Sequence, residues 1–134
     1  MFELAMQEGA APISLKQVAG HQGLSENYLE QLMGALRRAG LVHSVRGAQG
    51  GYLLGRAPER ITTGDIIRAL EGSISMADCA AEDGRTVEHC GDPEGCMAKE
   101  VWVRVSESIA NTLDSITLAD LCREAKERQG MYYI

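Results

Sequence analysis

Three cysteines in the middle of the chain have side chains that could do chemistry: Cys79, Cys90 and Cys96, spaced Cys–x10–Cys–x5–Cys. Thiolates are soft, anionic ligands that suit iron–sulfur clusters and zinc, and exposed thiolates are also readily oxidised. The spacing lacks the close cysteine pairs of zinc fingers and zinc ribbons. Three uses of the cysteines therefore remain possible. They could bind a metal, including a structural zinc ion, they could undergo redox chemistry, or they could be ordinary unligated thiols.

The segment at 73–95, which carries Cys79 and Cys90 and ends just before Cys96, is long for a loop in a compact protein, and such loops are usually functional or disordered. Gly84, Gly91, Pro93 and Gly95 lie in it. Glycine and proline between ligands allow a backbone to fold around a cluster and to direct N–H groups at its sulfurs. The fourth cysteine, Cys122, falls on the apolar face of an expected helix and is predicted to be a core residue.

The basic residues suggest a second chemistry, because charge is distributed unevenly along the chain. Residues 1–60 hold six basic and five acidic residues, whereas residues 61–134 hold seven and fourteen and so account for the net charge of −6. Between residues 31 and 58 there is no acidic residue. The arginines in this stretch are Arg37, Arg38, Arg46 and Arg56. The pattern favours a first half that faces an anion, with chance clustering as the alternative.

Two helices in this first half are predicted to form a helix-turn-helix. Ser14 begins a short helix with a capping box, Gly23 permits a turn, and Ser25 caps a second helix. Leu24 is expected to fill the core between them. One apolar face of the second helix repeats at i, i+3, i+4 and i+7, with Leu29, Leu32, Met33 and Leu36. An ordinary helical hairpin would leave the same marks.

A small β-hairpin is predicted directly after the second helix, which makes the unit a winged helix. Two β-rich runs, 41–45 and 52–54, flank a glycine-rich tip. Arg46 lies where the first strand meets the tip, from which it can reach a DNA minor groove. Phosphate contacts are expected from Arg37, Arg38 and Arg56.

The second half is predicted to contain a helix from Thr62 to Gly72, a long helix from Cys96 to about Leu113, and a short helix over 118–126. The long helix has one apolar stripe, formed by Trp102, Val105, Ile109 and Leu113. This stripe packs either on its own chain or on a second copy. We favour a homodimer, because one winged helix contacts few base pairs and dimers read palindromic sites.

These expectations define a mainly α protein with a small two-stranded wing, in which a winged helix-turn-helix is joined to a long dimerisation helix. The predicted division is 1–60 for DNA binding, 61–95 for a linking helix and the cysteine loop, and 96–134 for the dimerisation helix and C-terminal helix. Met1–Glu8 is helical in period but has no N-cap, which predicts that the helix begins before the first residue present.

Composition and motifs also exclude other classes of protein. With 134 residues and 45% apolar content the chain can bury one core. No apolar run approaches the ~20 residues that span a bilayer, and no leader opens the chain, so a soluble cytoplasmic protein without membrane contact is expected. There is no Ser/His/Asp set, phosphate-binding glycine loop or paired-carboxylate signature, so we do not expect an enzyme.

Three sequence runs resemble a known family. They are SENYLEQLMGALRRAGLVHSVRGAQGGYLL at 25–54, ITTGDIIRALEG at 61–72 and CMAKEVWVRVSESIANTLDSITLADL at 96–121. They are similar to the IscR/NsrR/RirA/CymR group of bacterial winged-helix transcriptional regulators, the Rrf-two (Rrf2) family. The resemblance implies homodimers joined through the long helix and a recognition helix that presents Asn27, Tyr28, Glu30 and Gln31 to promoter DNA. It also implies that Arg46 reaches the DNA from the wing.

The resemblance further implies an iron–sulfur cluster, 2Fe–2S or 4Fe–4S, on Cys79, Cys90 and Cys96, whose state controls promoter binding. The alternative within the family is a cluster-free regulator that responds by thiol oxidation or through a protein partner. Two departures bear on the cluster. Some members have a histidine ligand three residues after the third cysteine, where this chain has Lys99, and the gap between Cys79 and Cys90 is longer than usual.

Overall fold

The computed structural model describes residues 1–7, 11–83, 91 and 94–132. The elements are α1 (Phe2–Met6), α2 (Leu15–Gln22), α3 (Glu26–Arg38), β1 (Val42–Val45), β2 (Gly51–Leu54), the 3₁₀ turn η1 (Pro58–Arg60), α4 (Thr63–Glu71), the 3₁₀ turn η2 (Asp78–Ala80), α5 (Met97–Asp114) and α6 (Leu118–Met131). The fold is mainly helical with one two-stranded antiparallel sheet, which confirms the predicted class.

Local sequence signals set the helix starts in the described part of the chain. Ser14, Thr62 and Thr117 each accept a hydrogen bond from the backbone N–H three residues on, and the side chain at that third position bonds back to the cap. These capping boxes satisfy backbone groups that a helix start leaves without partners. Gly23 ends α2 at φ +64°, a left-handed conformation that glycine adopts without strain, and this turn leads into α3.

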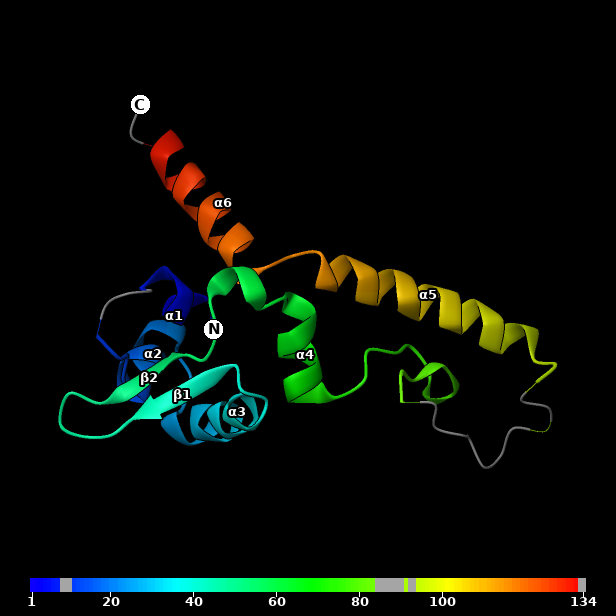
Figure 1. Ribbon diagram of the computed structural model, residues 1–134, viewed down its shortest axis with the longest axis horizontal. Coiled ribbons are helices and arrows are strands. Elements are labelled where there is room, and N and C mark those ends of the chain that lie inside the picture. Colours follow the sequence, from blue (N-terminus) through cyan, green and yellow to red (C-terminus); the bar gives the residue numbers. More distant parts are fainter. Residues whose placement is uncertain (8–10, 84–90, 92–93, 133–134) are drawn as a thin grey trace.

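The wing is the hairpin of β1 and β2, and it is attached to the start of α2. Val42 pairs with Leu54 and Val45 with Gly51 across the antiparallel ladder. Ile13 and Tyr52 exchange backbone hydrogen bonds of 3.1 and 2.8 Å, which extends the pairing to the segment before α2. The strands therefore have a fixed position beside the helix-turn-helix, and the 46–50 tip projects from it (Figure 1).

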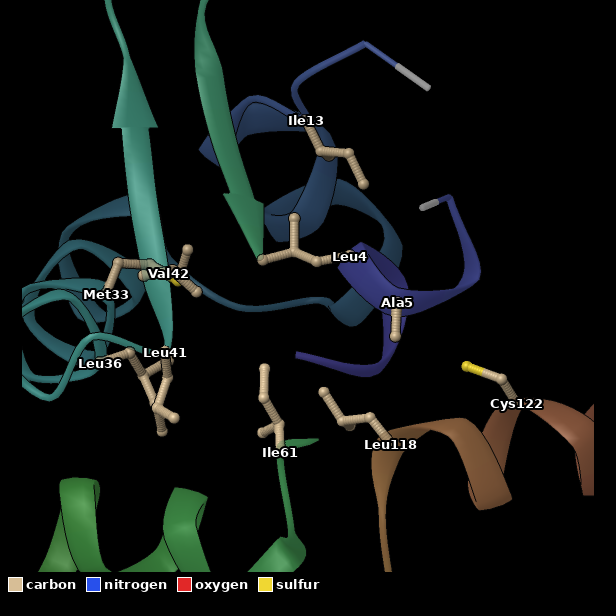
Figure 2. Close-up of a cluster of buried hydrophobic side chains, with 10 residues drawn as sticks. All are labelled: Leu4, Ala5, Ile13, Met33, Leu36, Leu41, Val42, Ile61, Leu118 and Cys122. Atoms are coloured by element: carbon tan, nitrogen blue, oxygen red, sulfur yellow. The ribbon is translucent and has the colours of Figure 1, made fainter. Parts of the chain in front are cut away.

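One apolar core joins the first half of the chain to α6 (Figure 2). Its residues are Leu4, Ala5, Ile13, Met33, Leu36, Leu41, Val42, Ile61, Leu118 and Cys122. Ile61 is fully buried, and its carbonyl accepts a 2.9 Å hydrogen bond from the N–H of Leu118. The predicted core position of Cys122 is confirmed. We call the unit formed by α1–α4, the wing and α6 the head.

The long helix α5 leaves the head, and the described first part of the cysteine-bearing segment, with η2, lies beside it (Figure 1). Next to the end of α5, Thr63 N–H donates to the carbonyl of Ile116 at 2.8 Å, and Thr62 forms a β-bridge with Thr117. The turn between α5 and α6 is thus bonded directly to the start of α4. The 3₁₀ turn η2 packs against α5.

Three local expectations differ from the structure. Leu24 does not fill the core but is 42% exposed, because Ala19 and Leu29 are the buried residues where α2 meets α3. The last helix continues to Met131 rather than ending near Lys126, since Glu127, Arg128 and Gln129 are good helix formers that carry it beyond Lys126. The 73–95 segment also contains the short turn η2 in its described part.

Candidate nucleic-acid interface and cysteine segment

The exposed face of α3 carries a shallow groove of about 530 Å³. It is lined by Asn27, Glu30, Gln31, Gly34 and Arg38. Four of these are residues that the sequence assigned to DNA contact, and the i, i+3, i+4 spacing of a helix brings them to one side. The opposite side of α3 is buried through Leu29, Met33 and Leu36. The helix can therefore enter a major groove without disturbing the core.

The remaining candidate DNA-binding residues are exposed but lie outside this groove. Tyr28 is 51% exposed near the start of α3, and Arg37 lies in its last turn. Arg46 directly follows β1, at the base of the wing tip. Arg56 donates from Nη2 to the carbonyl of Ala39 at 3.3 Å, so it also closes the C-terminal end of α3. Tyr28 and Arg37 therefore flank the groove on α3, whereas Arg46 and Arg56 follow the two strands of the wing.

Gly34 is a groove residue that the sequence reasoning missed, although a glycine inside an amphipathic helix is a signal. A Cβ at this position would meet only Arg38 Nη1, at 3.5 Å, which is ordinary contact. The backbone therefore has room for alanine, and alanine favours a helix by about 0.5–1 kcal/mol over glycine. The absence of a side chain keeps the middle of the groove open.

Gly34→Ala is expected to raise the free energy of unfolding by about 0.5–1 kcal/mol while weakening DNA binding several-fold, because a methyl group would occupy the groove. Urea unfolding and fluorescence anisotropy measure the two effects. Gly20→Ala is the matched control, since Gly20 is an exposed helical glycine in α2 where an added Cβ would have nothing within 4 Å. Unchanged DNA affinity in Gly34→Ala would remove this position from the interface.

Two of the three candidate metal ligands lie on elements that contact each other. Cys79 is in η2, Cys96 is the N-cap of α5, and both are half-buried free thiols. Cys90 lies outside the described residues. Within the part of the chain that is described, no group of three His, Cys, Asp or Glu side chains could hold a metal ion.

The first part of the cysteine-bearing segment is held at several points. Ser106, the buried polar residue of α5, accepts a 3.0 Å hydrogen bond from the N–H of Met76. Ser73 Oγ accepts from the N–H of Glu82 at 2.7 Å, and Glu82 in turn accepts from the N–H of Ile74 at 3.2 Å. Arg68 of α4 also binds Glu82. Arg68 was missed from the sequence, because its partners lie 14 and 46 residues away along the chain.

The outer face of α5 carries an apolar surface. Met97 is 73% exposed, Val101 57%, Trp102 41% and Val105 37%. The other side of the helix is buried through Ser106 and Ala110. Contiguous exposed apolar side chains of this kind mark an interaction surface rather than a surface that faces water. We refer to these four residues as the α5 face.

A helix-turn-helix with an antiparallel wing and an exposed second helix defines a winged-helix DNA-binding protein. The chain belongs to the Rrf2 family, whose profile, described as "Iron-dependent Transcriptional regulator", matches residues 1–124. The predicted family is thereby confirmed. The protein is a transcriptional regulator and not an enzyme.

Individual relatives support this assignment. The HTH-type transcriptional regulator CymR of Bacillus subtilis (strain 168) is 46% identical over 136 residues, which cover 100% of this chain and 91% of the relative. The solved structure of B. subtilis CymR, described as the global cysteine regulator, matches 92% of this chain and 87% of that chain with a TM-score of 0.73. The structure of T. potens IscR is 48% identical and matches 98% of this chain and 87% of that chain with a TM-score of 0.74.

Among the residues that the structure describes, no helix is both long and apolar enough to cross a bilayer.

Proposed function

We propose that the protein binds palindromic promoter DNA as a homodimer and that its cysteine-bearing segment controls this binding. The exposed α3 groove carries the first part of the proposal, because it gathers Asn27, Glu30, Gln31 and Arg38 on one open surface. We expect Tyr28 to contact bases together with the residues of the α3 groove, and Arg46 to enter a DNA minor groove. Phosphate contacts are expected from Arg37, Arg38 and Arg56.

Gln31→Ala is expected to weaken binding to the preferred site by about 1–3 kcal/mol and to relax specificity at one base position, because a glutamine amide pairs in two places with adenine. Selection from a random-sequence DNA library, followed by anisotropy measurements, gives both values. Gln129→Ala is the control, since Gln129 lies on an exposed part of α6 away from α3. An unchanged base preference in Gln31→Ala would exclude this residue from base readout.

The α5 face supports the dimer. Its four residues project from a helix that leaves the head, and burying them against a second copy would remove their apolar area from water. A dimer also places two α3 helices for successive major grooves, which a palindrome requires. The functional division that follows is a DNA-binding region over 1–60, a sensing region over 61–95 and a dimerisation region over 96–134, from which α6 returns to the head.

An iron–sulfur cluster is the proposed sensing group. The donor chemistry fits, because Cys79 and Cys96 are free, half-buried thiols on the contacting elements η2 and α5. Cys90 would complete a set of three thiolate ligands. When bound, a cluster of either nuclearity, 2Fe–2S or 4Fe–4S, supplies a redox-active iron–sulfide centre. The description of the family as iron-dependent agrees with this choice.

Regulation without a cluster is the second candidate, and the likeness to CymR favours it. That relative matches the whole length of this chain, and its solved structure is described as that of a cysteine regulator. In this case the same free thiols would act directly, by oxidation or by binding a protein partner. Both candidates place the control of DNA binding in the cysteine-bearing segment and Cys96, which directly follows it.

An anaerobic assay for iron, sulfide and zinc, with a visible spectrum, separates the candidates. The comparison is between the wild-type protein and a Cys79→Ala/Cys90→Ala/Cys96→Ala variant, with Cys122→Ser as the control for loss of a thiol outside the segment. Matching iron and sulfide, with absorbance between roughly 320 and 460 nm that the triple variant loses, supports the cluster. Zinc alone would indicate a structural site. Protein that stays colourless after anaerobic reconstitution would favour direct thiol chemistry.

A further inference from the structure

Arg68 joins three elements that are distant in the sequence. Its guanidinium lies in the second half of α4, and it binds Glu82 of the cysteine-bearing segment through Nε at 3.0 Å and Nη2 at 2.7 Å. The same group binds Asp114, the last residue of α5, through Nη1 at 2.6 Å and Nη2 at 3.0 Å. One cation therefore holds two carboxylates in two-point contacts, the geometry in which guanidinium pairs are strongest.

The packing around this cluster is close on the α4 side. Gly64 is buried in the first turn of α4, and a Cβ there would collide with the carboxylate of Asp114 and lie 2.9 Å from Arg68 Nη1. The glycine allows the end of α5 to approach α4. Beside it, Thr63 Oγ1 donates to the carbonyl of Leu113 at 2.6 Å. Arg68, Glu82 and Asp114, which we call the Arg68 cluster, thus lie against the bonded junction of α4 and α5.

The electrostatics agree with a persistent contact. The guanidinium lowers the pKa of both Glu82 and Asp114 below their ordinary values by hydrogen bonding to the carboxylates. Both groups are therefore anions at neutral pH and hold the same cation. The side chains remain partly exposed, at 31% for Arg68, 37% for Glu82 and 41% for Asp114, so the cluster can open without exposing apolar core.

We infer that Arg68 is a positioning residue that couples the cysteine-bearing segment to the α4–α5 junction, so that a change in the segment alters how α5 is held against the head. The inference rests on the proposed sensing role of that segment. Glu82 connects the segment to Arg68. It is itself held within the segment, because its backbone N–H donates to Ser73 Oγ and its carboxylate accepts from the N–H of Ile74. Asp114 is the contact from α5. Opening either contact removes the link that Arg68 makes between the segment and α5, while the bonds of Thr63 to Leu113 and Ile116 remain.

Two variants test the coupling, each with one contact removed. Glu82→Gln removes the ionic contact of the segment with Arg68, and Asp114→Asn removes the ionic contact of α5 with Arg68. Glu71→Gln is the charge-matched control, because Glu71 ends the same helix outside the cluster. In reduced protein, the rate at which N-ethylmaleimide labels Cys79 is measured by peptide mass spectrometry. The second readout is the ratio of the DNA Kd before and after labelling of Cys79, Cys90 and Cys96, using the duplex that the wild-type protein selects.

We expect Glu82→Gln to speed labelling of Cys79 about two- to fivefold, the range that partly exposed ion pairs provide, and to reduce the Kd ratio to less than half of the wild-type value. Asp114→Asn should reduce the ratio equally while labelling stays near the wild-type rate. Glu71→Gln should match the wild type in both readouts. Thermal unfolding verifies that each variant is folded.

The outcomes separate this inference from the proposed function. A wild-type Kd that labelling does not change overturns the sensing role of the segment, and the coupling with it. A wild-type response that survives unchanged in both Glu82→Gln and Asp114→Asn overturns the coupling alone. Faster labelling of Cys79 without any change in the Kd ratio also overturns it, because Arg68 would then only hold the segment in place.

Discussion

Trp102→Glu/Val105→Glu is expected to convert the protein to a monomer of 14.5 kDa and to weaken binding to a palindromic site by at least about 100-fold. Both side chains belong to the α5 face, at 41% and 37% exposure in the single chain. Two carboxylates buried without partners in the proposed dimer interface would cost several kcal/mol, so we expect the dimer to dissociate. Losing the second head then removes the gain from simultaneous binding at two half-sites.

Sedimentation velocity measures the oligomeric state, and anisotropy with full palindromes and isolated half-sites measures DNA binding. The half-site affinity should stay near that of the wild type. Arg128→Glu is the control, since it changes the net charge by the same two units on an exposed residue in the last turn of α6, outside the α5 face. A double variant that still sediments as a dimer would exclude the α5 face as the interface.

Ile61→Ala is expected to lower the free energy of unfolding by about 2–5 kcal/mol, a large part of the stability of a domain of this size. Ile61 is fully buried between residues of α1, the wing and α6, as Figure 2 shows, and its truncation leaves a cavity where these elements meet. The loss should extend to α6, since Leu118 packs against the same site and binds the Ile61 carbonyl.

Urea unfolding followed by circular dichroism measures this loss, and hydrogen exchange in residues 118–126 measures the release of α6. Ile61→Val provides a graded comparison with an expected loss of about 0.5–1.5 kcal/mol. Val45→Ala, at a 37% exposed position of β1, should change stability by about 0.5 kcal/mol or less. A loss below about 1 kcal/mol for Ile61→Ala would mean that the junction between the head and α6 rearranges to fill the cavity.

Much of the fold was predictable because its signals are local. The capping boxes at Ser14, Thr62 and Thr117 depend on residues three positions apart, and all three are present in the structure. The hairpin depends on two short β-rich runs around glycines, and it forms β1 and β2. A helix with one apolar stripe identified α5, although periodicity alone could not show that Trp102 and Val105 stay exposed on the single chain.

The contacts that connect distant parts of the chain could not be predicted in this way. Arg68 binds residues 14 and 46 positions away, and no local pattern relates them. The packing of α6 into the head could not be predicted either. The apolar character of Leu118 indicates that this residue is buried, but it does not indicate which element it packs against. Leu24 shows the converse error, since an apolar residue in a turn was expected to be buried and is exposed.

The candidate DNA residues were predicted from the resemblance and from side-chain chemistry, and the structure adds their arrangement. Asn27, Glu30, Gln31 and Arg38 share one groove, while Tyr28, Arg46 and Arg56 lie outside it. Gly34 became recognisable as a groove residue only when its neighbours were placed. The assignment of individual roles stays a prediction, which the Gln31 and Gly34 variants address.

The attachment of α5 to the head gives the molecule the mechanics of a lever with its pivot at one end. The hydrogen bonds of Thr63 to Ile116 and of Leu118 to Ile61 fix the pivot. The arm has 18 residues and therefore a length of about 27 Å. A tilt of about 4° at the pivot displaces the far end by about 2 Å, since displacement scales with the length of a rigid helix. In the proposed dimer, small angular changes beside Asp114 would therefore suffice to change the separation of the two DNA-reading heads.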